Sequence, residues 1–244
     1  MISEMELRLK NKQLENAIAQ VKKASQARSH FLSSISHEIR TPLSGVIGLA
    51  DALSDRQIDP HGREIVEGIK SSSQILMGLL NDVLDYAKIE AGKFQIHRKN
   101  IEVEKYLKNF TRIWENMATE KGLSFSLSVG EDLPDVLAMD ELRFTQILNN
   151  IFSNAIKFTR EGGVSLEIRR TELKGLPAFQ IQISDTGKGM SKAQLEKLFY
   201  PFEQADASIA HEHGGTGLGM AITKSLVSLL EGEMHCESQL SKGT

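Results

Sequence analysis

The 244-residue sequence predicts an all-α helical hairpin followed by an α/β two-layer sandwich. Two patterns of apolar residues carry this prediction. Up to Gly92, apolar residues recur every three or four positions, which is typical of packed helices. Beyond Gly92, several stretches have an apolar residue at every second position, which is typical of half-buried strands.

The first helix is expected to run without a break from near the N-terminus to about residue 54. Its apolar residues recur at the a and d positions of a heptad, the spacing of a helix that packs along one seam. This seam comprises Leu7, Leu14, Ile18, Val21, Leu32, Ile35, Ile39, Pro42, Val46, Leu49 and Leu53. Up to residue 28 the pattern is that of a coiled coil, and polar residues at Asn11, Ser25 and Arg28 either weaken the pairing or fix its register.

A second helix is expected after the turn-forming stretch from Ser54 to Pro60. Its own seam comprises Ile65, Ile69, Ser72, Leu76, Leu79, Val83 and Tyr86. Two helices with so short a connection form an antiparallel hairpin. One hairpin cannot cover both apolar stripes, so two copies are expected to pack as a dimeric four-helix bundle, which makes the protein a homodimer.

The second half alternates strands and helices. Strands are predicted around Phe125–Val129, Val164–Ile168 and Phe179–Ile183, and helices at roughly 103–121, 141–157, 191–198 and 216–231. Asp140 is the expected N-cap of the second of these helices, and Gly232 is expected to end the last. The order predicts a sheet with helices on one face.

Composition narrows the class of protein. A net charge of −3 and a pI near 6.2 argue against binding to nucleic acid, because phosphates call for a positive surplus. The single Cys236 cannot form an internal disulfide, which favours a reducing compartment and a cytoplasmic location. No apolar run approaches the roughly 20 residues that span a bilayer, so no membrane contact is expected of this fragment, although the full-length protein can be membrane-anchored.

Two asparagines in the stretch N149-N-I-F-S-N-A-I-K-F-T159 are candidate metal ligands. A helix places Asn150 and Asn154 on one face, where their amide oxygens can share a hard cation that bridges phosphates. Lys157 is one turn further on and can meet phosphate charge. Asparagines on a helix are more often simply solvated, so this motif alone does not establish a site.

Two glycine-containing motifs follow. In D185-T-G-K-G189, Asp185 comes after a strand, and its carboxylate can accept a hydrogen bond from an exocyclic amine while the glycines let the backbone approach a flat ring. In G214-G-T-G-L-G219, the glycines precede a helix whose N-terminal N–H groups favour an anion. A capped turn and a flexible loop are the alternatives for these two motifs taken singly.

With L198-F-Y-P-F-E-Q204 between them, these motifs stand in the order of the N, G1, F and G2 boxes. Residues 96 to 244 thus resemble the ATP-binding domain of histidine kinases and of the related gyrase, Hsp90 and MutL ATPases. The resemblance implies a two-layer sandwich of the histidine-kinase/Hsp90 ATPase type that binds ATP and Mg²⁺.

The resemblance also implies roles for individual residues. Asn154 would be the principal Mg²⁺ ligand with Asn150 in support, and Asp185 would accept from adenine beside the turn formed by Gly187 and Gly189. The segment from Phe199 to Thr216 would be a mobile lid over the nucleotide, and His211 and His213 are expected to be plain lid residues. The phosphates would be enclosed by Gly215, Thr216, Gly217, Leu218 and Gly219.

Asn150 bears on the fate of the phosphoryl group. Relatives that hydrolyse ATP carry a Glu at this position to deprotonate water, whereas an amide has no useful basicity. The phosphoryl group is therefore expected to go to an acceptor other than water.

His37 is the predicted acceptor. With Leu32 at an a position, His37 falls at f and points away from the seam, as does His30 one heptad earlier. The neighbours of the two histidines differ: Glu38 follows His37 and can take the Nδ1 proton, whereas Phe31 follows His30 and cannot. Pro42 lacks an N–H and favours a bend just beyond the acceptor.

The stretch S36-H-E-I-R-T-P-L43 resembles the H-box of the commonest class of histidine kinases. The resemblance implies that Glu38 is the general base of autophosphorylation and that Thr41 positions water in a reverse phosphatase reaction. It also implies a response-regulator receiver domain as partner. The expected organisation is an N-terminal coiled-coil signalling helix (1–28), a dimerisation and histidine phosphotransfer domain (29–95) and a catalytic ATP-binding domain (96–244).

Gly243 and Thr244 resemble the start of the family's last glycine motif, which a closing strand usually follows, so a longer protein such as a hybrid kinase is expected. Three rival functions stay open at this point. The chain could be a coiled-coil scaffold that binds ATP without kinase activity, a phosphatase of its partner, or an ATPase of the gyrase type. The sequence specifies neither the stimulus nor the cognate regulator.

Overall fold

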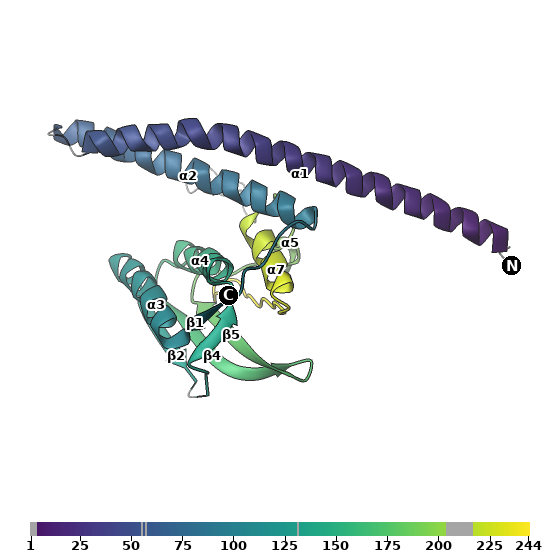
Figure 1. The fold of residues 1–244 in the computed structure, drawn as a ribbon. Helices are drawn as coiled ribbons and strands as arrows, with labels where there is room; N and C mark the ends of the chain where they lie inside the picture. The colour runs from purple at the N-terminus through teal and green to yellow at the C-terminus, as the bar shows by residue number, and fades with distance from the viewer. Residues whose placement is uncertain (1–3, 55, 57, 131, 204–216) are drawn as a thin grey trace. The chain divides into compact units, whose positions relative to one another are not determined.

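A computed structural model describes residues 4–54, 56, 58–130, 132–203 and 217–244. The chain divides into two compact units, Met1–Phe94 and Gln95–Thr244 (Figure 1). The first is a helical hairpin and the second an α/β unit with a mixed sheet. The predicted fold class is thus confirmed.

The helical unit consists of α1 (Glu4–Ser54) and α2 (Pro60–Glu90), as the heptad pattern predicts. The carboxylate of Asp59 accepts from the backbone N–H of Gly62 at 2.6 Å, and Pro60 stands in the first turn, where no N–H is needed. After α2, Gly92 adopts a φ of 65°, which ends the helix. These local signals explain why the hairpin turns where it does.

Two contacts set the register of the hairpin. Asp51 and Lys70 form an ion pair at 2.7 Å, and the Arg40 guanidinium donates to the Asn81 side chain at 3.0 Å. Within one chain the helices bury a narrow stripe of mostly small or aliphatic residues. Its fully buried members are Ser36, Ala50, Val66, Ser73, Leu84, Asp85 and Ala87.

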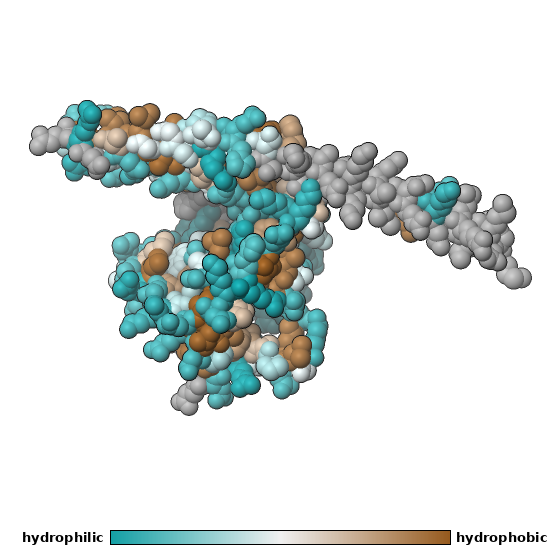
Figure 2. Space-filling view, viewed as in Figure 1, coloured by the Kyte–Doolittle hydropathy of each residue, from teal (hydrophilic) through white to brown (hydrophobic). Residues whose placement is uncertain are grey.

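Much of the predicted heptad seam is not part of that stripe. The side chains of Leu49 and Ile65 are 70% and 50% exposed. The exposed seam residues are Leu14, Ile39, Val46, Leu49, Leu53, Ile65, Ile69 and Leu76. Apolar side chains accordingly show at the surface of the hairpin (Figure 2). A single chain therefore leaves an apolar stripe uncovered.

The second unit contains a three-stranded sheet in the order β2-β4-β5, in which β2 is parallel and β5 antiparallel to β4. Its elements are β1 (Lys99–Glu102), α3 (Val103–Glu120), β2 (Ser124–Val129), β3 (Val136–Met139), α4 (Glu141–Phe158), β4 (Gly163–Leu173), β5 (Leu176–Asp185), α5 (Lys192–Lys197) and α7 (Gly219–Leu229). The predicted strands correspond to β2, β4 and β5, and the predicted helices to α3, α4, α5 and α7.

Two features differ from prediction. The short strands β1 and β3 pair antiparallel to each other and were not predicted, because four residues are too few to show a period of two. The last helix does not end with Gly232 in the left-handed position. Glu231 adopts that conformation with a φ of 66°, while Gly232 donates to the Val227 carbonyl at 2.9 Å to close the helix end.

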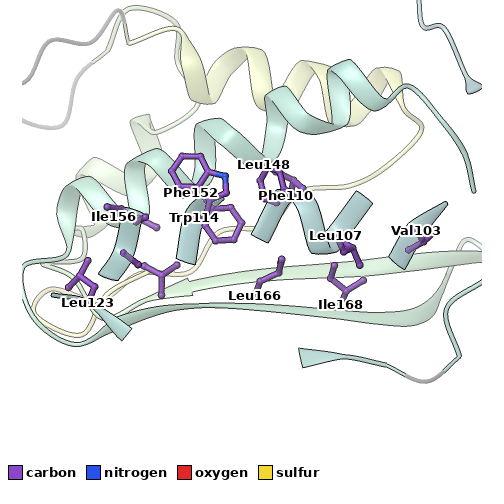
Figure 3. Close-up of a cluster of buried hydrophobic side chains, with 13 residues drawn as sticks. Val103, Leu107, Phe110, Trp114, Leu123, Leu148, Phe152, Ile156, Leu166 and Ile168 are labelled. Carbon is purple, nitrogen blue, oxygen red and sulfur yellow. The ribbon is translucent and has the colours of Figure 1, made fainter. Parts of the chain in front are cut away.

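The core of this unit lies between the sheet and helices α3 and α4 (Figure 3). Phe152 of α4 is fully buried, and its ring lies 5.5 Å from that of Trp114 and 5.6 Å from that of Phe110, both on α3. Leu166 and Ile168 of β4 point up into the same cluster. The aromatic contacts fix α4 against α3, and α4 carries the two candidate metal ligands.

Candidate functional site

Helix α4 is held at both ends. At its start the Asp140 carboxylate accepts from the backbone N–H groups of Arg143 at 3.1 Å and His97 at 2.8 Å, which confirms Asp140 as the N-cap. At its end the Lys121 ammonium donates to the Ile156 carbonyl at 2.6 Å, where the helix dipole favours a cation. No local sequence signal marks Lys121 for this role, because its partner is 35 positions away.

The three nucleotide-binding motifs meet at α4. The turn after β5 packs against the C-terminal end of α4. The backbone N–H of Lys188 donates to the Phe158 carbonyl at 3.2 Å, and a Cβ on Gly187 would stand 2.5 Å from that oxygen. The start of α7 packs against the side of α4, where a Cβ on Gly219 would stand 2.5 Å from Asn150 Oδ1. At Gly187 the atoms in the way are backbone, so a side chain would push the turn off α4, whereas at Gly219 a side chain would displace the Asn150 amide.

The two candidate metal ligands differ in their hydrogen bonding. The Asn150 amide donates to the Thr223 hydroxyl at 2.7 Å, and this bond orients its oxygen toward Gly219. Asn154 is partly exposed, and none of the described residues forms a hydrogen bond with its side chain. Amide oxygens are hard ligands suited to Mg²⁺, so the donor set fits such an ion with Asn154 as the more accessible ligand.

Asp185 is half-buried at the end of β5. Its Oδ1 accepts from the Gly187 backbone at 2.8 Å. The pKa of this carboxyl is raised above its ordinary value, chiefly by burial, although the backbone N–H groups of Gly187 and Thr244 act in the opposite direction. One carboxylate oxygen is thus engaged by the turn, and the group as a whole is positioned to accept from a ligand.

Two lysines lie over the ring of Phe158, with Lys157 Nζ 5.1 Å and Lys188 Nζ 4.9 Å from its centroid. Burial and the neighbouring charge of Lys188 lower the pKa of Lys157. An anion beside these ammonium groups would offset their mutual repulsion. The role of Lys157 toward phosphate stays a prediction.

The start of α7 is described from Gly217 onward, whereas Gly215, Thr216 and residues 204–214 of the predicted lid lie outside the described residues. Gly217 adopts a φ of 68°, and a Cβ there would stand 2.8 Å from the Glu203 carbonyl. Leu218 is fully buried, so only its backbone can serve a ligand. The first N–H groups of α7 have no partner within the helix, which suits an anion.

The candidate acceptor lies on the helical unit. His37, Glu38 and Thr41 are all exposed on α1. The Thr41 hydroxyl donates to the His37 carbonyl at 3.2 Å. Neighbouring positions on a helix point about 100° apart, and no hydrogen bond between His37 and Glu38 is present in the described part of α1. A role of Glu38 as base therefore requires its side chain to swing toward the imidazole.

The α/β unit gathers its asparagine- and glycine-containing motifs around one helix, and the hairpin exposes a histidine beside a carboxylate. Together these two features are typical of kinases that phosphorylate a histidine. Residues 27–92 match the model of the His Kinase A (phospho-acceptor) domain. Residues 139–244 match the model of the histidine kinase-, DNA gyrase B- and HSP90-like ATPases. The chain belongs to the histidine kinases and comprises their phospho-acceptor and ATP-binding domains.

Individual relatives agree with this assignment. The chain is 36% identical over 233 residues to the autoinducer 2 sensor kinase/phosphatase LuxQ of Vibrio cholerae. It is 35% identical over 240 residues to the signal transduction histidine-protein kinase BarA of Escherichia coli. The matches cover 96% and 98% of the chain but 27% and 26% of the relatives, so the chain spans about a quarter of their length.

Solved structures show the same fold. The crystal structure of full-length ShkA in complex with AMPPNP superposes with a TM-score of 0.72 at 32% identity, covering 87% of this chain and 43% of that one. The histidine kinase AdeS of Acinetobacter baumannii superposes with a TM-score of 0.56 at 20% identity, covering 85% and 93%. The second likeness concerns the fold alone.

None of the described helices combines the length and the apolar character needed to cross a membrane. Among the side chains that the structure describes, no cluster of three or more His, Cys, Asp or Glu suited to a metal ion occurs. The candidate ligands Asn150 and Asn154 are amides and belong to none of these four residue types.

Proposed function

We propose that this chain uses ATP to phosphorylate its own His37 and then transfers the phosphoryl group to an aspartate of a response-regulator receiver domain. The observation that carries the proposal is the convergence of three nucleotide-binding motifs on α4, with the non-basic Asn150 facing the start of α7. Position 150 carries an amide, which cannot act as the base that activates water. His37, in contrast, is exposed and has a nucleophilic side chain.

The chemistry follows from the residues. Asp185 accepts from the base of ATP, and the N-terminus of α7 with Lys157 receives the phosphates. Asn154, supported by Asn150, would hold Mg²⁺, which neutralises charge on the phosphates. His37 Nε2 forms a bond to the γ-phosphorus as the bond from that phosphorus to the β,γ-bridging oxygen breaks, ADP leaves, and Glu38 takes the Nδ1 proton.

We further propose that the chain acts as a homodimer. The seam residues from Ile39 to Leu53 on α1, and from Ile65 to Leu76 on α2, form the exposed apolar stripe of the hairpin. A second hairpin with the same stripe would complete a four-helix bundle and remove both stripes from water. The division at Phe94 and the two family matches support residues 29–95 as the dimerisation unit, 96–244 as the ATP-binding unit and 1–28 as a coiled coil.

The test is incubation of the chain with ATP labelled at the γ-phosphate. We expect a label that is stable to alkali, labile to acid and absent from His37→Gln. His30→Gln is the matched control, because His30 occupies the same heptad position and should leave labelling unchanged. Chelation of Mg²⁺ should abolish labelling. A chain that binds ATP without becoming labelled would instead be a scaffold, and steady phosphate release without phosphohistidine would indicate a gyrase-type ATPase.

A phosphatase activity toward the partner is a second proposal. Thr41 lies one turn from His37 on the same face of α1, and the LuxQ relatives are sensor kinase/phosphatases by name. Thr41→Ala should abolish partner dephosphorylation while autophosphorylation persists. Loss of both activities would show that Thr41 supports the acceptor helix instead.

Because ATP and a receiver domain are the proposed substrates, we place this part of the protein in the cytoplasm, with any membrane anchor elsewhere in a longer chain.

A further inference from the structure

Arg40 lies on the same side of α1 as the candidate acceptor. Ser36 is fully buried in the stripe that the hairpin encloses. Because successive residues of a helix are rotated by about 100°, His37 and Arg40 are turned from Ser36 in the same sense, by about 100° and about 40°. Long side chains on a helix also lean toward its N-terminus, so the side chain of Arg40 is directed over the turn that carries His37.

The Arg40 guanidinium is held from across the hairpin. Its Nη2 donates to Asn81 Oδ1 at 3.0 Å, and both side chains are exposed. An arginine has five N–H donors in a planar fork, of which this bond uses one. No carboxylate among the described residues pairs with Arg40, and Glu38, two positions away, faces another direction on the helix. The guanidinium thus has a fixed place and donors left for an anion.

The other bridge across the hairpin differs in charge. Asp51 and Lys70 pair at 2.7 Å, and they lie 11 positions from Arg40 and Asn81, respectively. Eleven residues make about three helical turns, so the two bridges lie on the same side of the hairpin. A carboxylate neutralises Lys70, whereas a neutral amide holds Arg40. Either bridge fixes the register of the hairpin, but only the second leaves a positive charge beside His37.

We propose that Arg40, positioned by Asn81, binds the phosphoryl group on His37 and stabilises the phosphohistidine. The planar fork of an arginine matches phosphoryl oxygens, and two parallel hydrogen bonds to them carry charge on both sides. The proposal rests on the proposed function and adds no covalent step to it. His37 Nε2 still bonds to the γ-phosphorus as the bond to the bridging oxygen breaks, ADP leaves and Glu38 takes the Nδ1 proton. Arg40 then neutralises the charge that has arrived on His37.

The test measures the equilibrium constant between ATP with unmodified His37 and ADP with phosphohistidine in the whole chain. The equilibrium is approached from ATP and, in reverse, from the phosphorylated chain with ADP, so that a change in rate alone has no effect. Arg40→Gln keeps a partner for Asn81 but removes the charge, and should lower the constant about fivefold. The difference should shrink as salt is added. Equal constants for variant and wild type would overturn the proposal.

The matched control is Asp51→Asn, which weakens the other bridge on the same side of the hairpin. It should leave the equilibrium constant unchanged. An equal fall in Asp51→Asn and Arg40→Gln would mean that both bridges act only through the register of the helices, and would overturn the proposal. If Arg40→Gln does not fold, Arg40→Lys serves in its place. The lysine keeps the charge but lacks the fork, so the constant should fall by about twofold, and an unchanged constant contradicts a role of the fork.

Two variants of Asn81 test its positioning role. Asn81→Asp still accepts from Arg40 but neutralises it, so the equilibrium constant should fall while the unfolding temperature of the hairpin does not. A bridge that serves register alone predicts an unchanged constant. Asn81→Leu releases the guanidinium and should lower the constant in the wild-type background but no further in Arg40→Gln. An equal effect of Asn81→Leu in both backgrounds would show that Asn81 does not act through Arg40.

The outcome for the wild-type chain separates this proposal from the proposed function. A chain that acquires no label on His37 refutes the proposed function, and this proposal with it. A chain that becomes labelled but has the same equilibrium constant in Arg40→Gln refutes only the role of Arg40.

Discussion

The helical unit and the α/β unit contrast in how they bury apolar residues. The α/β unit encloses its own core, in which Phe152 and Leu148 are almost completely inaccessible between the sheet and the helices. The hairpin encloses only the narrow stripe through Ala50 and Val66 and leaves Leu49 and Ile65 exposed. The α/β unit thus has a closed core within one chain, whereas the helical unit leaves an apolar surface uncovered.

The contrast assigns different physical tasks to the two units. A closed core fixes α4 and the motifs packed on it, so the geometry of the nucleotide site is set within one chain. In the proposed homodimer, the uncovered stripe would make the stability of the hairpin depend on association and therefore on concentration. Substitutions that act on one unit and spare the other can break or sharpen this distinction.

The largest effect is expected from the closed core. Phe152→Ala removes a ring that contacts Trp114, Phe110 and Phe125, and should destabilise the α/β unit by about 3–5 kcal/mol. Nucleotide binding should be lost while the chain still forms dimers, as measured by calorimetric titration and analytical ultracentrifugation. Loss of dimers in the same variant would show that the units do not fold independently.

The next effect concerns the uncovered stripe. Leu49 and Leu142 are 70% and 68% exposed, one on the hairpin and the other on the α/β unit. Leu49→Glu should raise the dimer dissociation constant at least tenfold because it places a charge in the bundle core, whereas Leu142→Glu should leave it unchanged. Sedimentation equilibrium checks both variants, and equal behaviour of the two would refute the assignment of the stripe as the dimer interface.

A gain of stability is expected at Ser36. Its side chain is fully buried in the hairpin, and its hydroxyl lacks a hydrogen-bond partner among the described residues. Ser36→Ala removes an unsatisfied polar group and favours the helix, so it should stabilise the hairpin by about 1–2 kcal/mol in thermal unfolding. The exposed Ser34→Ala is the control for helix propensity alone, and an equal gain there would mean that burial of the hydroxyl costs nothing.

The smallest effect is a dependence on pH. Burial, and then the charge of Asp85, raise the pKa of Asp82 to about 6 from an ordinary value of 3.8. The folded hairpin thus holds this proton more tightly than the unfolded chain, so stability falls as the pH rises from about 4 to about 6. Asp82→Asn should remove this part of the pH dependence and add about 1 kcal/mol at pH 7.5, after allowance for solvent screening. Identical unfolding temperatures of variant and wild type at pH 5 and pH 7.5 would contradict the assignment.

Patterns that repeat along the chain could be predicted from the sequence, and contacts between distant segments could not. The heptads predict α1 and α2, and Asp140 predicts the start of α4, because each signal is contained in a few neighbouring residues. The partnership of Asn150 with Thr223 joins positions 73 apart, and that of Met190 with Ser238 joins positions 48 apart. Such pairs follow from the topology of the sheet, which no local pattern encodes.

Helix α1 has three angular sectors with different neighbours. One sector, through Ala50, packs on α2; a second, through Leu49, is exposed and apolar; a third carries His37 and Thr41. A disruptive substitution between residues 37 and 53 should therefore affect folding, assembly or phosphoryl chemistry according to its angle on the helix. A complete mutational scan of this segment would show the three phenotypes returning in the same order every seven residues, and the phase of that pattern would identify which sector each residue occupies.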